Sequence, residues 1–125
     1  MTPKMRIEGQ QKLISVLIPV YNEEGNIRRA YEAVRDTFDQ LKDRYTFEII
    51  FTDNHSTDGS IAIISELAKS DTRVRAVRFA RNFGFQRSVL TGYRLASGDA
   101  AIQLDCDLQD PPSLFPKFLE LWEQG

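Results

Sequence analysis

The chain has 125 residues, the length of one domain, and its 42% hydrophobic and 27% charged residues exclude a disordered protein. Its 16 Lys+Arg against 18 Asp+Glu leave a net charge of −2, which argues against nucleic acid as a partner. The sequence has one cysteine, no Cys/His cluster for zinc and no apolar run long enough to span a bilayer, so we expect a cytoplasmic protein without disulfides.

Four runs of apolar residues predict β-strands. They lie at Leu13–Val20, Phe47–Asp53, Arg73–Phe79 and Ala100–Asp105. The first run is nearly all apolar, as in strands that are covered on both faces of a sheet, and segments of helical period follow each run. This alternation predicts an α/β fold with a parallel sheet, in which a ligand binds beyond the carboxyl ends of the strands.

Four segments place apolar residues at helical spacing, and each is expected to form one apolar face. These faces consist of Ile27, Ala30, Tyr31, Val34, Phe38 and Leu41, of Ile61, Ile64, Leu67 and Ala68, of Val89, Leu90, Tyr93 and Ala96, and of Leu114, Phe115, Phe118, Leu121 and Trp122. We expect Gly98 to close the third helix. In the last helix, Asp110 is predicted as the N-cap and Pro111 as the first helical residue.

Asp105 and Asp107 are the most informative polar residues, because they directly follow an apolar strand and are one residue apart. Two carboxylates so close repel each other unless a cation lies between them, and oxygen ligands on a short turn suit Mg²⁺ or Mn²⁺ bound to substrate phosphates. Gln109 could supply a further oxygen. A helix cap is the alternative role, but Asp110 fits it better, and Cys106 is expected to be a packed side chain rather than a nucleophile.

Asp53 ends the second strand and begins a polar turn. Its carboxylate could accept a hydrogen bond from the N–H of a nucleobase, and an Asx turn with a helix cap is the alternative. Ser56 and Asp58 already suffice for that cap, which favours ligand binding for Asp53 and a structural role for Asp58. His55, the only histidine, is expected to be an exposed turn residue.

Arg81 follows the third strand and faces the same predicted site, where a guanidinium suits a diphosphate. The other arginines of this stretch are expected on the solvated surface. Two common phosphate sites are excluded, because the chain has no G-x-G-x-x-G after its first strand and no P-loop lysine.

Four motifs stand at the predicted strand exits. They are Ile18–Glu24 (IPVYNEE), Asp53–Gly59 (DNHSTDG), Arg81–Gly84 (RNFG) and Leu104–Pro112 (LDCDLQDPP). From Ile14 to its end, the chain resembles glycosyltransferase family 2, the inverting enzymes with the GT-A fold. The last two motifs are similar to the branch of polyprenyl-phosphate sugar transferases, such as dolichol-phosphate mannose synthase-like enzymes, whose metal-binding motif reads D-A-D-L-Q-D-P-P. This chain has Cys106 for that alanine, and Asn54 and His55 for the usual Asp and Gly of D-D-G-S-x-D-G.

The resemblance implies the Rossmann-like, nucleotide-binding half of a GT-A domain, with strand order 3-2-1-4 and helices on both faces of the sheet. It implies a nucleotide-sugar site formed by Pro19, Tyr21, Glu23, Asp53, Arg81, Asp105 and Asp107. It also implies a Mg²⁺ or Mn²⁺ site formed by Asp105, Asp107 and Gln109. Residues 1–12 are expected to be an N-terminal extension, and residues 13–125 the nucleotide-sugar-binding part.

The implied activity is transfer of a hexose or modified sugar from a UDP- or GDP-sugar to polyprenyl phosphate, with inversion, for cell-envelope or glycan synthesis. The acceptor-binding half, the catalytic base and often membrane segments follow the D-x-D motif in this family. We therefore expect a piece of a longer enzyme, inactive alone, whose full length lies at the cytoplasmic face of a membrane. Family members with a polysaccharide or protein acceptor are an alternative, and a module that only binds nucleotide sugar is another.

Overall fold

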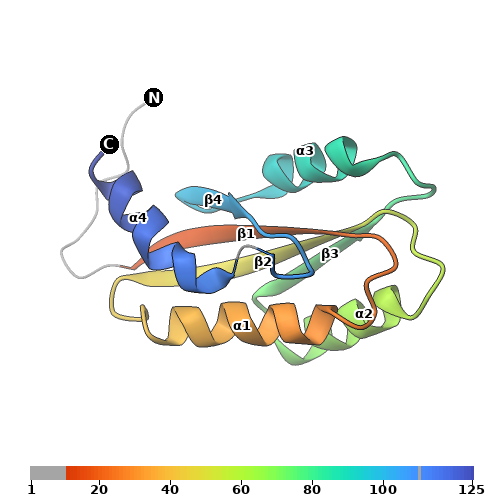
Figure 1. The fold of residues 1–125 in the computed structure, drawn as a ribbon, viewed down its shortest axis with the longest axis horizontal. Coiled ribbons are helices and arrows are strands. Elements are labelled where there is room, and N and C mark those ends of the chain that lie inside the picture. The colour runs from red at the N-terminus through yellow and green to blue at the C-terminus, as the bar shows by residue number, and fades with distance from the viewer. Residues whose placement is uncertain (1–10, 110) are drawn as a thin grey trace.

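The computed structural model describes residues 11–109 and 111–125, in which four parallel strands form one sheet of order β3-β2-β1-β4 (Figure 1). The elements in chain order are β1 (Lys12–Val20), α1 (Ile27–Asp39), β2 (Tyr45–Asp53), α2 (Ser60–Ser70), β3 (Val74–Arg78), α3 (Phe85–Leu95), β4 (Ala100–Gln103), the 3-10 helix η1 (Pro112–Leu114) and α4 (Phe115–Glu123). The predicted α/β class and strand order are confirmed. Because the strands are parallel, their carboxyl ends all lie at one edge of the sheet.

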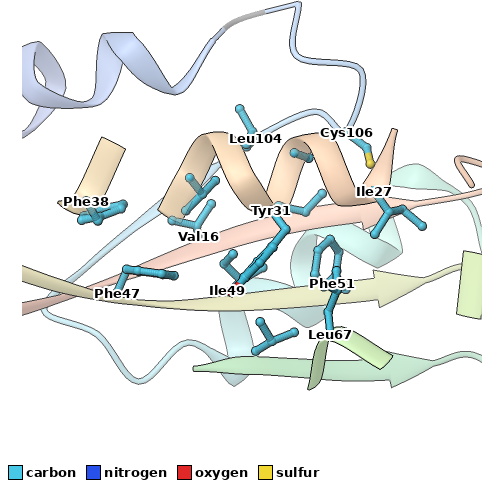
Figure 2. Close-up of a cluster of buried hydrophobic side chains, with 14 of the residues drawn as sticks. Val16, Ile27, Tyr31, Phe38, Phe47, Ile49, Phe51, Leu67, Leu104 and Cys106 are labelled. Carbon is cyan, nitrogen blue, oxygen red and sulfur yellow. The ribbon is translucent and has the colours of Figure 1, made fainter. Parts of the chain in front are cut away.

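Helices cover both faces of this sheet, as predicted: α1 and α2 lie on one face and α3 on the other (Figure 1). Successive residues of β2 point to opposite faces. Phe47, Ile49 and Phe51 belong to the core cluster beneath α1 and α2 (Figure 2). Glu48 and Thr52, one residue out of phase with them, point toward α3. Both faces of β2 are buried. The neighbouring strand β1 is buried along most of its length as well, which explains its nearly continuous apolar sequence.

The strands differ from their predicted bounds by one or two residues, and the difference at β4 affects the site. This strand ends at Gln103 rather than at Asp105. The main chain continues along β1 for one more residue, since Leu104 N–H donates to Leu17 O at 2.9 Å, and then a turn closes with Leu108 N–H donating to Asp105 O at 3.0 Å. The aspartate pair therefore lies in a turn. At the other end of the sheet β1 already begins at residue 12, and residues 1–10 of the predicted extension lie outside the described residues.

α1 buries the apolar face that its sequence predicts, and α2 buries the centre of its predicted face. In α1 the buried residues are Ile27, Ala30, Tyr31, Val34 and Phe38, and Leu41 packs against the core beyond the end of the helix. In α2, Ile64 and Leu67 are buried. These two helices and the sheet enclose the main hydrophobic core.

α3 turns a different face to the sheet than its apolar residues predict. Ser88 and Gly92 are its buried residues, whereas Leu90 and Tyr93 are each 45% exposed. A Cβ atom on Gly92 would lie 3.3 Å from the Cβ of Leu17, so the lack of a side chain allows the helix to approach β1 closely. The prediction of the inner face from apolar spacing is wrong here, because small residues decide how near the helix can lie.

Gly98 does not close α3, which ends at Leu95, contrary to the prediction. It lies instead against β1, where its N–H donates to Ser15 Oγ at 2.9 Å. Ser15 Oγ donates in turn to Glu48 Oε2 at 2.6 Å, and the N–H and hydroxyl of Ser97 donate to the same oxygen, each at 2.8 Å. A buried carboxylate thereby ties the α3–β4 connection to the sheet.

α4 begins later than predicted and buries only one residue of its predicted apolar face, Phe115. Pro111 has extended backbone, with φ −73° and ψ 151°, and η1 separates it from α4. Phe115, whose ring centre is 6.0 Å from that of Phe38, and Leu119 are buried in the core. The remaining residues of the predicted apolar face, all 38–55% exposed, are Leu114, Phe118, Leu121 and Trp122. Asp110, the predicted N-cap, lies outside the described residues.

Candidate functional site

A cavity of about 470 Å³ lies at the carboxyl edge of the sheet, where an open α/β fold is expected to bind its ligand. The segments that follow all four strands line it, together with the start of α3. The lining residues are Pro19, Val20, Tyr21, Glu23, Asn54, Asn82, Gly84, Phe85, Ser88, Asp105, Cys106 and Asp107. The cavity thus brings together five of the predicted binding residues, namely Pro19, Tyr21, Glu23, Asp105 and Asp107. Asp53, Arg81 and Gln109 do not line it.

Each strand is followed at this edge by one residue with positive φ. Asn22, His55 and Leu108 have φ values of 51°, 65° and 60°, and Gly84 has a φ of 92°. Such backbone costs about 1 kcal/mol or more for residues other than glycine and is concentrated at functional sites. Its repetition after all four strands supports a function at this edge of the sheet.

The turn after β1 is held against the turn after β2. The N–H groups of Asn22 and Glu23 donate to the hydroxyls of Ser56 at 2.9 Å and Ser60 at 3.0 Å. Asn22 Oδ1 in turn accepts the N–H of Thr57 at 2.8 Å. These bonds fix the turn that carries Tyr21, a 47% exposed side chain that lines the cavity.

Asp53 and Asn54, at the end of β2, have different surroundings. The Asp53 carboxylate is fully buried, accepts the main-chain N–H and the hydroxyl of Ser56, and lies 3.5 Å from the guanidinium of Arg78. Asn54 lines the cavity instead. The sequence predicts Asp53 as the base-binding residue, whereas the structure places its carboxylate inside the turn and brings Asn54, which the prediction omits, to the ligand-facing surface.

Asp58 and His55 have the places that their sequence context predicts. Asp58 accepts the N–H of Ser60 at 2.9 Å and that of Glu24 at 3.2 Å, so its role is structural. His55 is exposed in the turn, and its Nδ1 lies 3.1 Å from Phe79 O.

Arg81 lies beside the cavity rather than in its wall. Its guanidinium carbon is 4.7 Å from the ring centre of Phe83, an exposed cation–π contact. Asn82 and Gly84, which the sequence places with Arg81 at the predicted site, form the wall at this point. The first turn of α3 completes this wall, and prediction from the sequence misses it. The hydroxyl of Ser88 is buried in that wall and has no hydrogen-bond partner within the described residues, so it is available to a polar atom of a ligand.

Asp105 and Asp107 bring two carboxylates to the same cavity, as predicted. Asp105 Oδ1 accepts a hydrogen bond from Gln103 Nε2 at 3.3 Å, and Asp107 Oδ1 accepts the N–H of Gln109 at 3.2 Å. Within residues 11–109 and 111–125, no group of three or more His, Cys, Asp or Glu side chains is placed to hold a metal ion. The donor set suits a hard cation, and a bound metal would need further oxygens from its ligand.

Cys106, between the two aspartates, is a packed side chain, as predicted. It is 3% exposed and belongs to the core cluster (Figure 2). Burial, with the nearby negative charges of Glu23 and Asp107, raises the pKa of its thiol to about 12. The thiol therefore stays protonated at neutral pH and cannot serve as a nucleophile.

Comparison with known proteins extends these observations. A family model described as glycosyl transferase family 2 matches residues 15–125. The bactoprenol glucosyl transferase of Shigella phage SfV is 44% identical over 112 residues, which are 90% of this chain and 36% of that protein. The undecaprenyl-phosphate 4-deoxy-4-formamido-L-arabinose transferase of Aeromonas hydrophila is 39% identical over 115 residues, 91% of this chain and 35% of that protein. The chain thus spans about a third of the length of these curated relatives.

The fold also resembles that of solved structures. A mannosyltransferase from Pyrobaculum calidifontis, solved with GDP-Man and Mn²⁺, superposes with a TM-score of 0.67. The match covers 78% of this chain and 28% of that one at 21% sequence identity. The similarity at this identity concerns the arrangement of the strands and helices.

Proposed function

We propose, from the premise that this chain belongs to glycosyl transferase family 2, that it forms the nucleotide-sugar-binding part of an inverting transferase whose acceptor is a polyprenyl phosphate. The observation that carries the proposal is the cavity at the carboxyl edge of the sheet, which Pro19 and Tyr21 line together with a pair of carboxylates, Asp105 and Asp107. The names of the two relatives, both transferases that act on lipid carriers, support the acceptor class.

The donor is a UDP- or GDP-sugar. Pro19 and Tyr21 offer apolar and aromatic surface for the base and ribose, and Glu23 lines the same wall. Arg81, exposed at the rim, would pair with the diphosphate after a side-chain rotation. Direct contact of Asp53 with the base stays a prediction, although its burial favours an indirect role through the turn.

Asp107 and Asp105 would hold Mg²⁺ or Mn²⁺ together with the diphosphate, with Gln109 as a further oxygen donor. The metal, when bound, neutralises the charge that develops on the leaving diphosphate. The chain's own carboxylates keep that ion next to the cavity wall that holds the donor. Their turn brings both carboxylates to the same cavity.

A lipid phosphate is already an anion at neutral pH, so transfer to it would not depend on a strong general base. No helix of residues 11–109 and 111–125 is long and apolar enough to cross a membrane. As the resemblance implies, we assign the catalytic residues and association with the cytoplasmic face of a membrane to other parts of the full-length enzyme.

The test is a transfer assay with the protein at its natural length. Purified protein is given UDP- and GDP-sugars with Mn²⁺, and either polyprenyl phosphate or soluble sugars as acceptors. We expect product only on the lipid phosphate, with the sugar in the inverted configuration. Product only on soluble sugars would instead support the family members with polysaccharide acceptors, and nucleotide binding without any product would support a binding module.

A further inference from the structure

Two asparagine side chains join the exits of β2 and β3 at the cavity wall. Asn54 Oδ1 accepts the main-chain N–H of Phe83 at 2.8 Å, and Asn54 Nδ2 donates to Asn82 Oδ1 at 2.7 Å. Asn82 Oδ1 also accepts the N–H of Gly84 at 2.8 Å. The segment that carries Arg81 and enters α3 is thus tied through side-chain amides to the end of β2.

The orientation of both amides in this pair follows from the main chain. An N–H group can only donate, so the atom of Asn82 that faces Gly84 N–H must be oxygen, and the atom of Asn54 that faces Phe83 N–H must also be oxygen. Asn54 is then obliged to present its NH₂ group to Asn82. The Asn54 amide is both an acceptor and a donor, and the oxygen of the Asn82 amide accepts two hydrogen bonds. Neither amide can be flipped without losing a hydrogen bond.

The burial of Asn54 makes its hydrogen bonds important for stability. Asn54 is 5% exposed, so an unpaired polar atom there would be costly, whereas the segment it holds is exposed. Phe83 is 41% exposed, and Gly84 takes a φ of 92° immediately before α3 begins. Asn82, Gly84 and the first turn of α3 form one wall of the cavity. The position of that wall relative to β2 depends on the amide pair.

We propose that Asn54 is a positioning residue for the nucleotide diphosphate, acting through Asn82 to hold the Asn82–Gly84 wall and the neighbouring Arg81 against the site. This inference rests on the proposed function for the identity of the ligand. It also gives a structural role to the asparagine that replaces the usual aspartate of the D-D-G-S-x-D-G turn. An aspartate could accept Phe83 N–H but would set a carboxylate oxygen against Asn82 Oδ1. Turning the Asn82 amide to offer its NH₂ group instead would lose the hydrogen bond from Gly84 N–H.

The chain contains a matched control for this change at Asn22. Its Oδ1 accepts the N–H groups of Thr57 at 2.8 Å and Asp58 at 3.3 Å, and these partners require only an acceptor. Asn22→Asp therefore adds the same charge at the same edge of the sheet and keeps these hydrogen bonds. Asn54→Asp adds the charge and removes the donor.

The experiment measures binding of UDP and of GDP, each with Mn²⁺, by titration calorimetry on the wild-type protein, Asn54→Asp, Asn82→Ala and Asn22→Asp. We expect affinity to fall by about tenfold or more in Asn54→Asp and in Asn82→Ala, and to change by less than about threefold in Asn22→Asp. In the double variant Asn54→Asp/Asn82→Ala, the aspartate should cost less than in the wild-type background, because the opposing oxygen is gone. Equal losses in Asn54→Asp and Asn22→Asp would overturn the proposal.

Amide hydrogen exchange at Phe83 and Gly84 provides a second measurement that needs no ligand. We expect both amides to exchange at least about tenfold faster in Asn54→Asp and unchanged in Asn22→Asp, with circular dichroism confirming that the variants are folded. Unchanged exchange at both amides would overturn the proposal. A wild-type protein that binds neither nucleotide but shows the expected exchange pattern would refute the proposed function and the ligand-positioning role while leaving the amide contact established.

Discussion

Glu48 is a charged residue that the sheet buries, with a side chain 9% exposed. Burial tends to raise the pKa of this carboxyl, but hydrogen bonds from Ser15, from Ser97 and from Arg75 outweigh it, and the pKa is lowered overall. Three parts of the chain thereby depend on one carboxylate: β1, β3 and the connection from α3 to β4. Its role is structural, since it does not line the cavity.

Replacing Glu48 by glutamine should destabilise the protein by about 1–3 kcal/mol, because the amide NH₂ would face donors that now meet an oxygen. Since the folded-state pKa is the lower one, the stability that the carboxylate contributes is present above its unfolded pKa and is lost as the pH falls through its folded pKa. Urea unfolding at neutral pH and at acidic pH measures both effects. The difference between wild type and variant should shrink in acid.

The control for this substitution is Glu66→Gln, which removes an exposed ion pair with Arg28. Its cost should stay below about 0.5 kcal/mol. A loss in Glu66→Gln as large as in Glu48→Gln would show that charge removal alone, rather than the buried network, accounts for the effect.

At the scale of the elements, the connection from α3 to β4 lies very close to β1, because Gly98 has no side chain. A Cβ on Gly98 would lie 2.6 Å from Ser15 Oγ and 2.7 Å from Leu13 O. The second of these contacts is with main chain, which cannot move without shifting β1. Asp99 N–H also donates to Leu13 O at 2.7 Å, so the chain after Gly98 lies alongside β1 before β4 begins.

Gly98→Ala should therefore destabilise the protein by about 1–3 kcal/mol through overpacking against β1. Gly25→Ala is the matched control, because a Cβ there meets nothing within 4 Å and the φ of Gly25 lies outside the left-handed region. It should be neutral or slightly stabilising. Thermal unfolding of the two variants beside the wild type measures the difference, and equal melting temperatures would contradict the assigned contact.

At the scale of the whole molecule, the proposed site predicts coupling between metal and nucleotide. Two carboxylates without a third acidic, histidine or cysteine ligand within the described residues should bind bare Mg²⁺ or Mn²⁺ weakly. Phosphate oxygens would complete the coordination. Mn²⁺ should then raise the affinity for UDP or GDP by about tenfold, and nucleotide should raise the affinity for Mn²⁺ by the same factor.

Titration calorimetry in both orders of addition tests this coupling. Asp107→Ala should remove most of it, and Asp36→Ala, which changes an exposed acid of α1, should leave it intact. Asp53→Ala should weaken nucleotide binding with or without metal, because it releases the turn after β2. Equal nucleotide affinity with and without metal in a folded wild-type sample would refute the metal–diphosphate site.

The sequence by itself determined the arrangement of the main elements. Alternating apolar runs and amphipathic segments are local patterns, and together they predict the α/β class. The resemblance to a known family implies the strand order, which the structure confirms. The motif at Asp105 and Asp107 was predicted for the same reason, since polar residues that directly follow a buried strand must lie at its carboxyl edge.

Only the tertiary structure decided which residues face the ligand and which faces of the helices are buried. β2 is buried on both faces, so its sequence does not reveal that Asn54, in phase with Glu48, points to the cavity and that Asp53 points away from it. The inner face of α3 is formed by Ser88 and Gly92, because the distance between a helix and a sheet depends on both surfaces at once. Hydrophobicity within one segment carries no information on the shape of the surface that it meets.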